Sequence, residues 1–143
     1  MTDEEYMRQA LAEARKAYDK DEVPIGAVVV CKDRIIARAH NLTETLCDAT
    51  AHAEMQAITA AENYLGAKYL TDCTLYVTVE PCPMCAGAIG WTQIGRLVYG
   101  APDEKRGYAR IAPRALHPKT QLAIGVLAEE AATLMQDFFR SKR

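Results

Sequence analysis

The sequence lacks long hydrophobic runs, and it has little Trp and Phe, with one Trp and two Phe among 143 residues. No apolar run approaches the roughly 18 residues that a membrane-spanning helix needs, so we expect no membrane segment. Internal repeats, low-complexity tracts and linkers rich in Pro, Gly or Ser are also absent. A chain of this length can bury one hydrophobic core without disulfide support. We therefore predict a soluble protein with a single domain over residues 1–143.

A secretory signal is lacking as well. Residues 2–5 read Thr-Asp-Glu-Glu, and such an acidic start has neither the basic nor the apolar region of a signal peptide. This favours a cytoplasmic protein, in which thiols stay reduced. The five cysteines, an odd number, then indicate buried thiols and metal ligands rather than a disulfide framework.

The charge is unevenly distributed along the chain. The formal net charge is −2, but residues 1–104 carry 9 basic and 16 acidic residues, whereas residues 105–143 carry 8 basic and 3 acidic ones. Five basic residues and no acid lie between Lys105 and Lys119. Such a patch can approach phosphates, although a solvated loop and tail would have the same composition.

Apolar periodicity and turn residues predict an ordered alternation of helices and strands. From residue 51 onward strands and helices alternate, which favours helices on both faces of the sheet. We predict an α/β protein with three α/β/α layers and a central mixed five-stranded sheet. The polar segment 101–120 shows no such periodicity and is expected to be functional or mobile. The expected helices cover residues 2–18, 51–64, 83–91 and a C-terminal segment from about 127, and the expected strands cover 25–30, 34–40, 74–79, 96–99 and 122–127.

Two short motifs lie where predicted helices begin. One is His52-Ala53-Glu54, and the other, directly after a strand, is Cys82-Pro83-Met84-Cys85. Residues two apart in a helix point about 200° away from each other, so His52 and Glu54 can converge only at a helix end. Two helix N-termini would then aim their positive ends at one point and favour thiolate over thiol.

These residue types in this pattern indicate a catalytic zinc site. We predict one Zn²⁺ per chain, held by His52, Cys82 and Cys85, because three nitrogen and sulfur ligands leave a tetrahedral ion one open position for water. Zinc lowers the pKa of bound water to about 7, which makes hydroxide available at neutral pH. Glu54 is predicted to be the catalytic residue that moves the protons.

Other interpretations of the same residues remain open at this point. Cys-x-x-Cys after a strand is also typical of a redox pair. A structural zinc would need a fourth ligand, and a zinc-stabilised binding module without catalysis would not depend on Glu54. The candidates for a fourth ligand are Cys31, Cys47, Cys73, His40 and His117.

The motifs resemble those of the bacterial tRNA-specific adenosine deaminases, in the cytidine and deoxycytidylate deaminase superfamily. His-x-Glu followed by Pro-Cys-x-x-Cys is the general signature of zinc deaminases that act on nucleobases. The resemblance extends over nearly the whole chain, through segments 22–28, 50–54, 75–82, 86–88, 94–96 and 137–140, together with Asn41. It implies a cytidine deaminase-like fold and hydrolytic deamination of the wobble adenosine to inosine in a tRNA anticodon loop.

The resemblance also implies partners and substrate contacts. It assigns the target base to Asn41 and Ala53, and the backbone of the anticodon loop to the loop of Asp103. In the family that the chain resembles, the C-terminal helix approaches RNA, and positions 138–140 match that helix here, although Phe138 also fits the core face. Family members act on an arginine tRNA and form homodimers, so both are expected here. Pro83 and the Gly90-Trp91 pair are similar instead to deaminases of free guanine or cytosine, which are the alternative.

Overall fold

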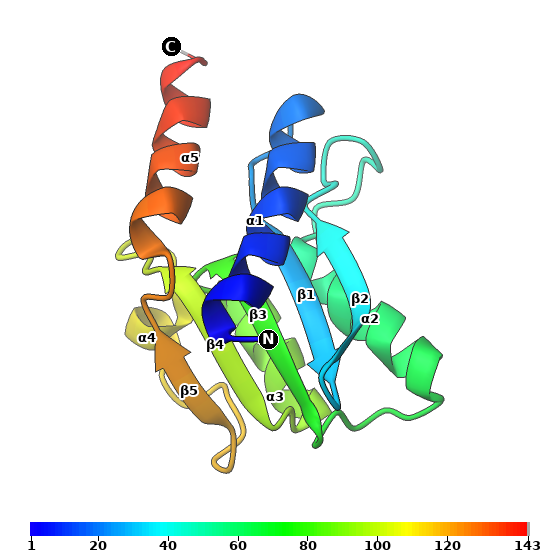
Figure 1. The fold of residues 1–143 in the computed structure, drawn as a ribbon. Coiled ribbons are helices and arrows are strands. Elements are labelled where there is room, and N and C mark those ends of the chain that lie inside the picture. The colour runs from blue at the N-terminus through cyan, green and yellow to red at the C-terminus, as the bar shows by residue number, and fades with distance from the viewer. Residues whose placement is uncertain (143) are drawn as a thin grey trace.

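A five-stranded mixed sheet forms the centre of the protein, as the sequence predicts (Figure 1). The computed structural model describes residues 1–142. The strands lie in the order β2-β1-β3-β4-β5. β1 is antiparallel to both of its neighbours, whereas β3, β4 and β5 are parallel. The strands are β1 (Gly26–Cys31), β2 (Arg34–His40), β3 (Cys73–Val79), β4 (Arg96–Ala101) and β5 (Gln121–Ile124).

Helices cover both faces of this sheet and complete the α/β/α layers. In Figure 1, α1 and α5 lie on the near face, while α2 and α3 lie behind the strands. The short α4 lies within the connection between β4 and β5. The three-layer prediction is therefore confirmed. The helices are α1 (Asp3–Asp19), α2 (Ala53–Leu65), α3 (Pro83–Thr92), α4 (Tyr108–Ile111) and α5 (Ala128–Arg140).

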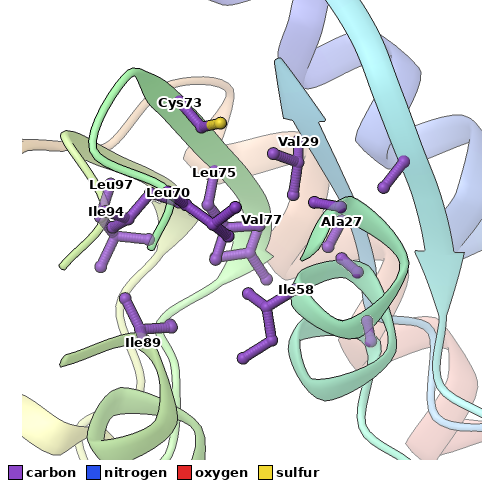
Figure 2. Close-up of a cluster of buried hydrophobic side chains, with 14 of the residues drawn as sticks. Ala27, Val29, Ile58, Leu70, Cys73, Leu75, Val77, Ile89, Ile94 and Leu97 are labelled. Atoms are coloured by element: carbon purple, nitrogen blue, oxygen red, sulfur yellow. The ribbon is translucent and has the colours of Figure 1, made fainter. Parts of the chain in front are cut away.

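Alternating apolar residues in the central strands form one hydrophobic cluster on each face of the sheet. Successive side chains of a strand point to opposite faces, so Val28 and Val30 pack with α1 whereas Ala27 and Val29 pack with α2. Figure 2 shows the cluster on the α2 side of the sheet, in which Leu75 and Val77 of β3 lie near Ile58 of α2. Burying one such side chain stabilises the fold by about 1.5–3 kcal/mol. This packing fixes α2 and α3 against the sheet.

The sheet topology brings the starts of two helices to the same end of the strands. β1 and β3 are antiparallel, with Ala27 opposite Val77, so β1 begins where β3 ends. The chain leaves β3 at Val79 and enters α3 at Pro83, where a proline suits the first helical turn. α2 also begins at this end of the sheet, because Leu42, just after β2, donates its backbone N–H to the carbonyl oxygen of Ala51, just before α2.

Several element boundaries differ from the sequence prediction, and β5 ends at Ile124 rather than at 127. α2 begins at Ala53 rather than at 51, since His52 has extended backbone dihedrals (φ −70°, ψ 156°) and is the N-cap. The segment 101–120 contains the four-residue helix α4. Among residues 1–142, the helices are too short or too polar to cross a membrane.

Candidate metal centre and active-site pocket

Three predicted metal ligands converge between the starts of α2 and α3. His52 is the N-cap of α2 and Cys82 the N-cap of α3, and neither side chain caps its helix with a hydrogen bond. Both are therefore free to face the space between the helices. His52 Nδ1 lies 3.7 Å from Cys82 Sγ and 3.5 Å from Cys85 Sγ. The three ligand atoms all lie within 4.8 Å of one another.

These distances fit a zinc ion. Bond lengths of about 2.0–2.1 Å to nitrogen and 2.3 Å to sulfur put tetrahedral ligand atoms about 3.6 Å apart. The donor set of one imidazole nitrogen and two sulfurs also suits zinc. Within the described residues, the potential fourth ligands Cys31, Cys47, Cys73, His40 and His117 lie outside this group. The geometry thus fits a three-ligand site with one open position better than a closed structural one.

One sulfur of the cluster, that of Cys82, ionises readily. The neighbouring Cys85, with help from His52, lowers the pKa of Cys82 to about 4 against the opposing effect of burial. The contact between His52 and the Cys82 sulfur raises the pKa of His52. The neighbouring Cys82 sulfur, together with burial, raises the pKa of the Cys85 thiol. The thiolate is the form of cysteine that binds a metal ion, and zinc accepts thiolate sulfur together with imidazole nitrogen.

Glu54 lies beside this cluster in the first turn of α2. Because His52 stands just outside the helix, the two side chains reach the same space, as expected for residues two apart at a helix end. Glu54 is 4% exposed. Burial raises its pKa to about 7. A carboxyl group with this pKa can both accept and donate a proton near neutral pH.

A pocket of about 510 Å³ opens over the cluster, a size typical of small-molecule sites. It brings the predicted substrate residues Asn41, Ala53 and Asp103 together with Glu54. Cys85 is fully buried behind its wall. The lining residues are Val23, Ile25, Asn41, Thr43, His52, Ala53, Glu54, Val79, Glu80, Cys82, Asp103, Lys105, Arg106, Met135 and Phe139.

The C-terminal helix reaches this pocket with one of its two adjacent aromatic residues. Phe138 is 6% exposed and packs edge-on against Tyr18 of α1. Phe139 is 46% exposed and lines the pocket, as does Met135 one turn before it. Phe138 therefore belongs to the core, and Phe139 is the aromatic residue that can meet a ligand.

The family model of the MafB19-like deaminases matches residues 1–143. The chain belongs to this deaminase family. It is 47% identical to the tRNA-specific adenosine deaminase of Bacillus subtilis over 146 residues, which cover 99% of this chain and 91% of that protein. It is also 45% identical to the chloroplastic tRNA(adenine(34)) deaminase of Arabidopsis thaliana, of whose length it spans 12%.

Solved structures of deaminases share this fold. One, from a study of A-to-I editing by tRNA:A34 deaminases at the wobble position, has a TM-score of 0.85 and 44% sequence identity. That match covers 91% of this chain and 98% of the other. The guanine deaminase of Bacillus subtilis has a TM-score of 0.68 and 41% identity, over 71% of this chain and 66% of that one.

Two buried carboxylates of this deaminase were missed by sequence reasoning. Glu80, 8% exposed, accepts hydrogen bonds from the backbone N–H groups of Asp103 (3.0 Å) and Ala109 (3.0 Å). It thereby holds the turn that carries Lys105 and Arg106 at the pocket. Glu22 holds the loop after β2 in the same way. No residue spacing marks either glutamate, because their partners are backbone groups distant in the sequence.

Asp103 has a structural role that the resemblance did not indicate. Its Oδ1 accepts hydrogen bonds from the backbone N–H groups of Lys105 (3.1 Å) and Arg106 (3.0 Å). The Asp103 carboxylate thus shapes the basic turn, besides lining the pocket.

Proposed function

We propose that this deaminase hydrolyses the wobble adenosine of a tRNA anticodon loop to inosine. The observation that carries the proposal is the pocket, where the buried Glu54 and the cationic Lys105 and Arg106 lie over the cluster of His52, Cys82 and Cys85. Deamination of a purine base requires the metal cluster and the glutamate. The phosphates that flank such a base in RNA would be bound by the cationic side chains. The near full-length similarity to tRNA-specific adenosine deaminases supports the same substrate.

The proposal includes one zinc ion per chain, held by His52 Nδ1 and the sulfurs of Cys82 and Cys85. Bound zinc supplies a Lewis acid that activates water at neutral pH. The two helix starts place backbone N–H groups and their positive ends around the site, which stabilises the thiolates that hold the ion. His52 and Cys82 stand at the N-cap positions of α2 and α3, and Cys85 lies in the first turn of α3.

Glu54 is the proton carrier in this proposal. Its carboxylate takes a proton from the attacking water and delivers it to the ring nitrogen N1, and it then assists the departure of ammonia from C6. The water oxygen forms a new bond to C6, and the bond from C6 to the amino nitrogen then breaks. Adenosine and water thus give inosine and ammonia. Burial in the first turn of α2 keeps the carboxyl group close to neutral pKa and away from bulk water.

Substrate contacts are proposed for the remaining pocket residues. The Asn41 side chain, 6% exposed at the pocket wall, offers an amide that can pair with a purine edge. Its oxygen accepts a long 3.4 Å hydrogen bond from the backbone N–H of Thr43, which orients the amide. Ala53 forms the floor beside Glu54, and the loop of Asp103 lies against the RNA backbone. The expected RNA is an arginine tRNA in the cytoplasm.

A homodimer is proposed from the outer surface of α3. This helix carries no charged residue, yet Trp91 is 84% and Met84 37% exposed, and Gly87, which lies between them, faces open space. An apolar helix of this kind is normally buried on all sides. A second copy of the chain would cover this surface. Trp91→Glu should then shift the sedimentation coefficient to that of a monomer, and an unchanged dimer would contradict this part of the proposal.

A free-base deaminase is the second candidate. The likeness to the guanine deaminase of Bacillus subtilis favours it, as does Pro83 in the cysteine motif. The same zinc ligands and the same glutamate would serve this reaction, so only the substrate differs. The cationic side chains at the pocket would then have no phosphate to meet.

The two candidates are separated by one assay with two substrates. The zinc-loaded protein should form inosine in an anticodon stem-loop and leave free guanine unchanged, whereas the reverse result favours the alternative. Glu54→Gln should lower kcat by about a hundredfold or more while zinc stays bound, because it removes a proton carrier and no metal ligand. Unchanged turnover in this variant would contradict the role of Glu54.

A further inference from the structure

The loop after β2 forms one wall of the pocket but has little regular structure of its own. It carries Asn41 and Thr43, which both line the pocket. Beyond Asn41 the chain continues through turns until α2 begins at Ala53. A wall that contacts substrate from an irregular loop needs an external support if it is to keep its shape.

Glu22 supplies that support from the connection between α1 and β1. Its Oε2 accepts hydrogen bonds from the backbone N–H of Thr45 (2.6 Å) and from the Thr45 hydroxyl (2.7 Å). Its Oε1 accepts a bond from the backbone N–H of Glu44 (3.1 Å) and a longer one from the Thr43 hydroxyl (3.5 Å). One carboxylate therefore binds three consecutive residues of the loop.

Glu22 is itself completely buried, with 0% exposure. Burial acts to raise the pKa of this carboxyl group, but the hydrogen bonds from Thr45, Glu44 and Thr43 outweigh it and leave the pKa lowered. The side chain does not line the pocket that holds the metal ligands. Any effect of Glu22 on the reaction must pass through the loop.

We propose that Glu22 is a positioning residue that fixes the Asn41–Thr45 wall and thereby sets substrate affinity. The inference rests on the proposed function, in which Asn41 holds the target base. Preorganising a binding wall reduces the ordering cost that substrate binding would otherwise include. Loss of Glu22 should therefore weaken binding, while Glu54 and the metal ligands, which lie on α2 and α3, keep their geometry.

Glu22→Gln is the sharpest perturbation. Glutamine keeps the size of the side chain, but its NH₂ group must face a loop donor, since each carboxylate oxygen accepts from a backbone N–H. We expect KM for the RNA to rise about tenfold, the factor that corresponds to one charge-assisted hydrogen bond. We expect kcat and zinc content to stay at the wild-type values.

A matched control is Asp3→Asn. The Asp3 carboxylate also accepts several hydrogen bonds, from Arg96 (2.7 and 2.6 Å) and from the Tyr76 hydroxyl (2.7 Å). These contacts tie α1 to β3 and β4 and involve no pocket residue. The control should lower stability and leave KM unchanged. Thr45→Val, which removes one hydroxyl donor and keeps the backbone N–H, should raise KM by a smaller factor.

The experiment measures KM, kcat, bound zinc and amide hydrogen exchange for the wild type and these variants. The amides of Glu44 and Thr45 should exchange faster in Glu22→Gln and at the wild-type rate in Asp3→Asn. Unchanged exchange, unchanged KM, or a fall in kcat with loss of zinc would each overturn the proposal. If wild-type protein deaminates free guanine and no RNA, the proposed function fails, and KM for guanine together with amide exchange then decides the role of Glu22.

Discussion

Replacing Glu54 by Gln should change the pH dependence of stability in the metal-free protein. Glu54 is 4% exposed, and burial raises the pKa of its carboxyl group from the ordinary 4.5 to about 7. The folded protein therefore binds this proton more tightly than the unfolded chain does. The stabilisation is complete below pH 4.5 and is lost as the pH rises through about 7.

The magnitude follows from the difference between the two pKa values. At about 1.4 kcal/mol per pKa unit, the wild type should lose about 3 kcal/mol relative to Glu54→Gln between about pH 4 and pH 8. Glutamine does not titrate, so other acidic groups cancel in the comparison. Urea unfolding of both proteins in chelator, at a series of pH values, measures this difference.

Bound zinc should reduce the effect, because a nearby divalent cation favours the ionised carboxylate. A stability difference that changes by less than about 1 kcal/mol across this range in the metal-free protein would refute the reasoning. It would mean that water reaches the carboxyl group and that the site is not desolvated.

Further predictions concern the metal, the basic turn and acid stability. Cys82→Ser should lose zinc and deamination together, as metal analysis and an activity assay would show; retained zinc would contradict its place as a ligand. Gly107→Ala should destabilise the protein by about 1–3 kcal/mol and weaken RNA binding, because a Cβ there would lie 2.1 Å from Glu80 Oε2; wild-type RNA affinity would be the contrary result. Hydrogen bonds from Arg96 lower the pKa of Asp3 below 3.8, so the advantage of wild type over Asp3→Asn in thermal unfolding should shrink as the pH falls through 3.8, and a constant advantage would count against this ion pair.

The metal cluster could be predicted from the sequence because its geometry is local. His52 and Glu54 are two residues apart, and Cys82 and Cys85 three apart, so helix geometry fixes each pair. The prediction that both pairs meet at helix ends is confirmed, with His52 and Cys82 as N-caps. The layer arrangement followed in a similar way from the alternation of strands and helices, and the structure confirms it.

The supports of the pocket could not be predicted because they join distant segments through the backbone. Glu22 bonds to residues 43–45, and Glu80 to Asp103 and Ala109. A backbone N–H looks the same at every position of a sequence, so such partners leave no motif. The start of α2 at Ala53 was missed for a different reason. Alanine is compatible with a helix, so the sequence does not show that the chain is still extended at the N-cap His52.

The most direct test of the central claim is nucleoside mass analysis of tRNA treated with the zinc-loaded protein in water labelled with heavy oxygen. Hydrolytic deamination predicts that the wobble adenosine becomes inosine and that the new oxygen at C6 carries the label. The metal-stripped protein and the Glu54→Gln variant should leave the adenosine unchanged. Absence of inosine from the wild-type reaction, or inosine without the label, would contradict the proposed reaction.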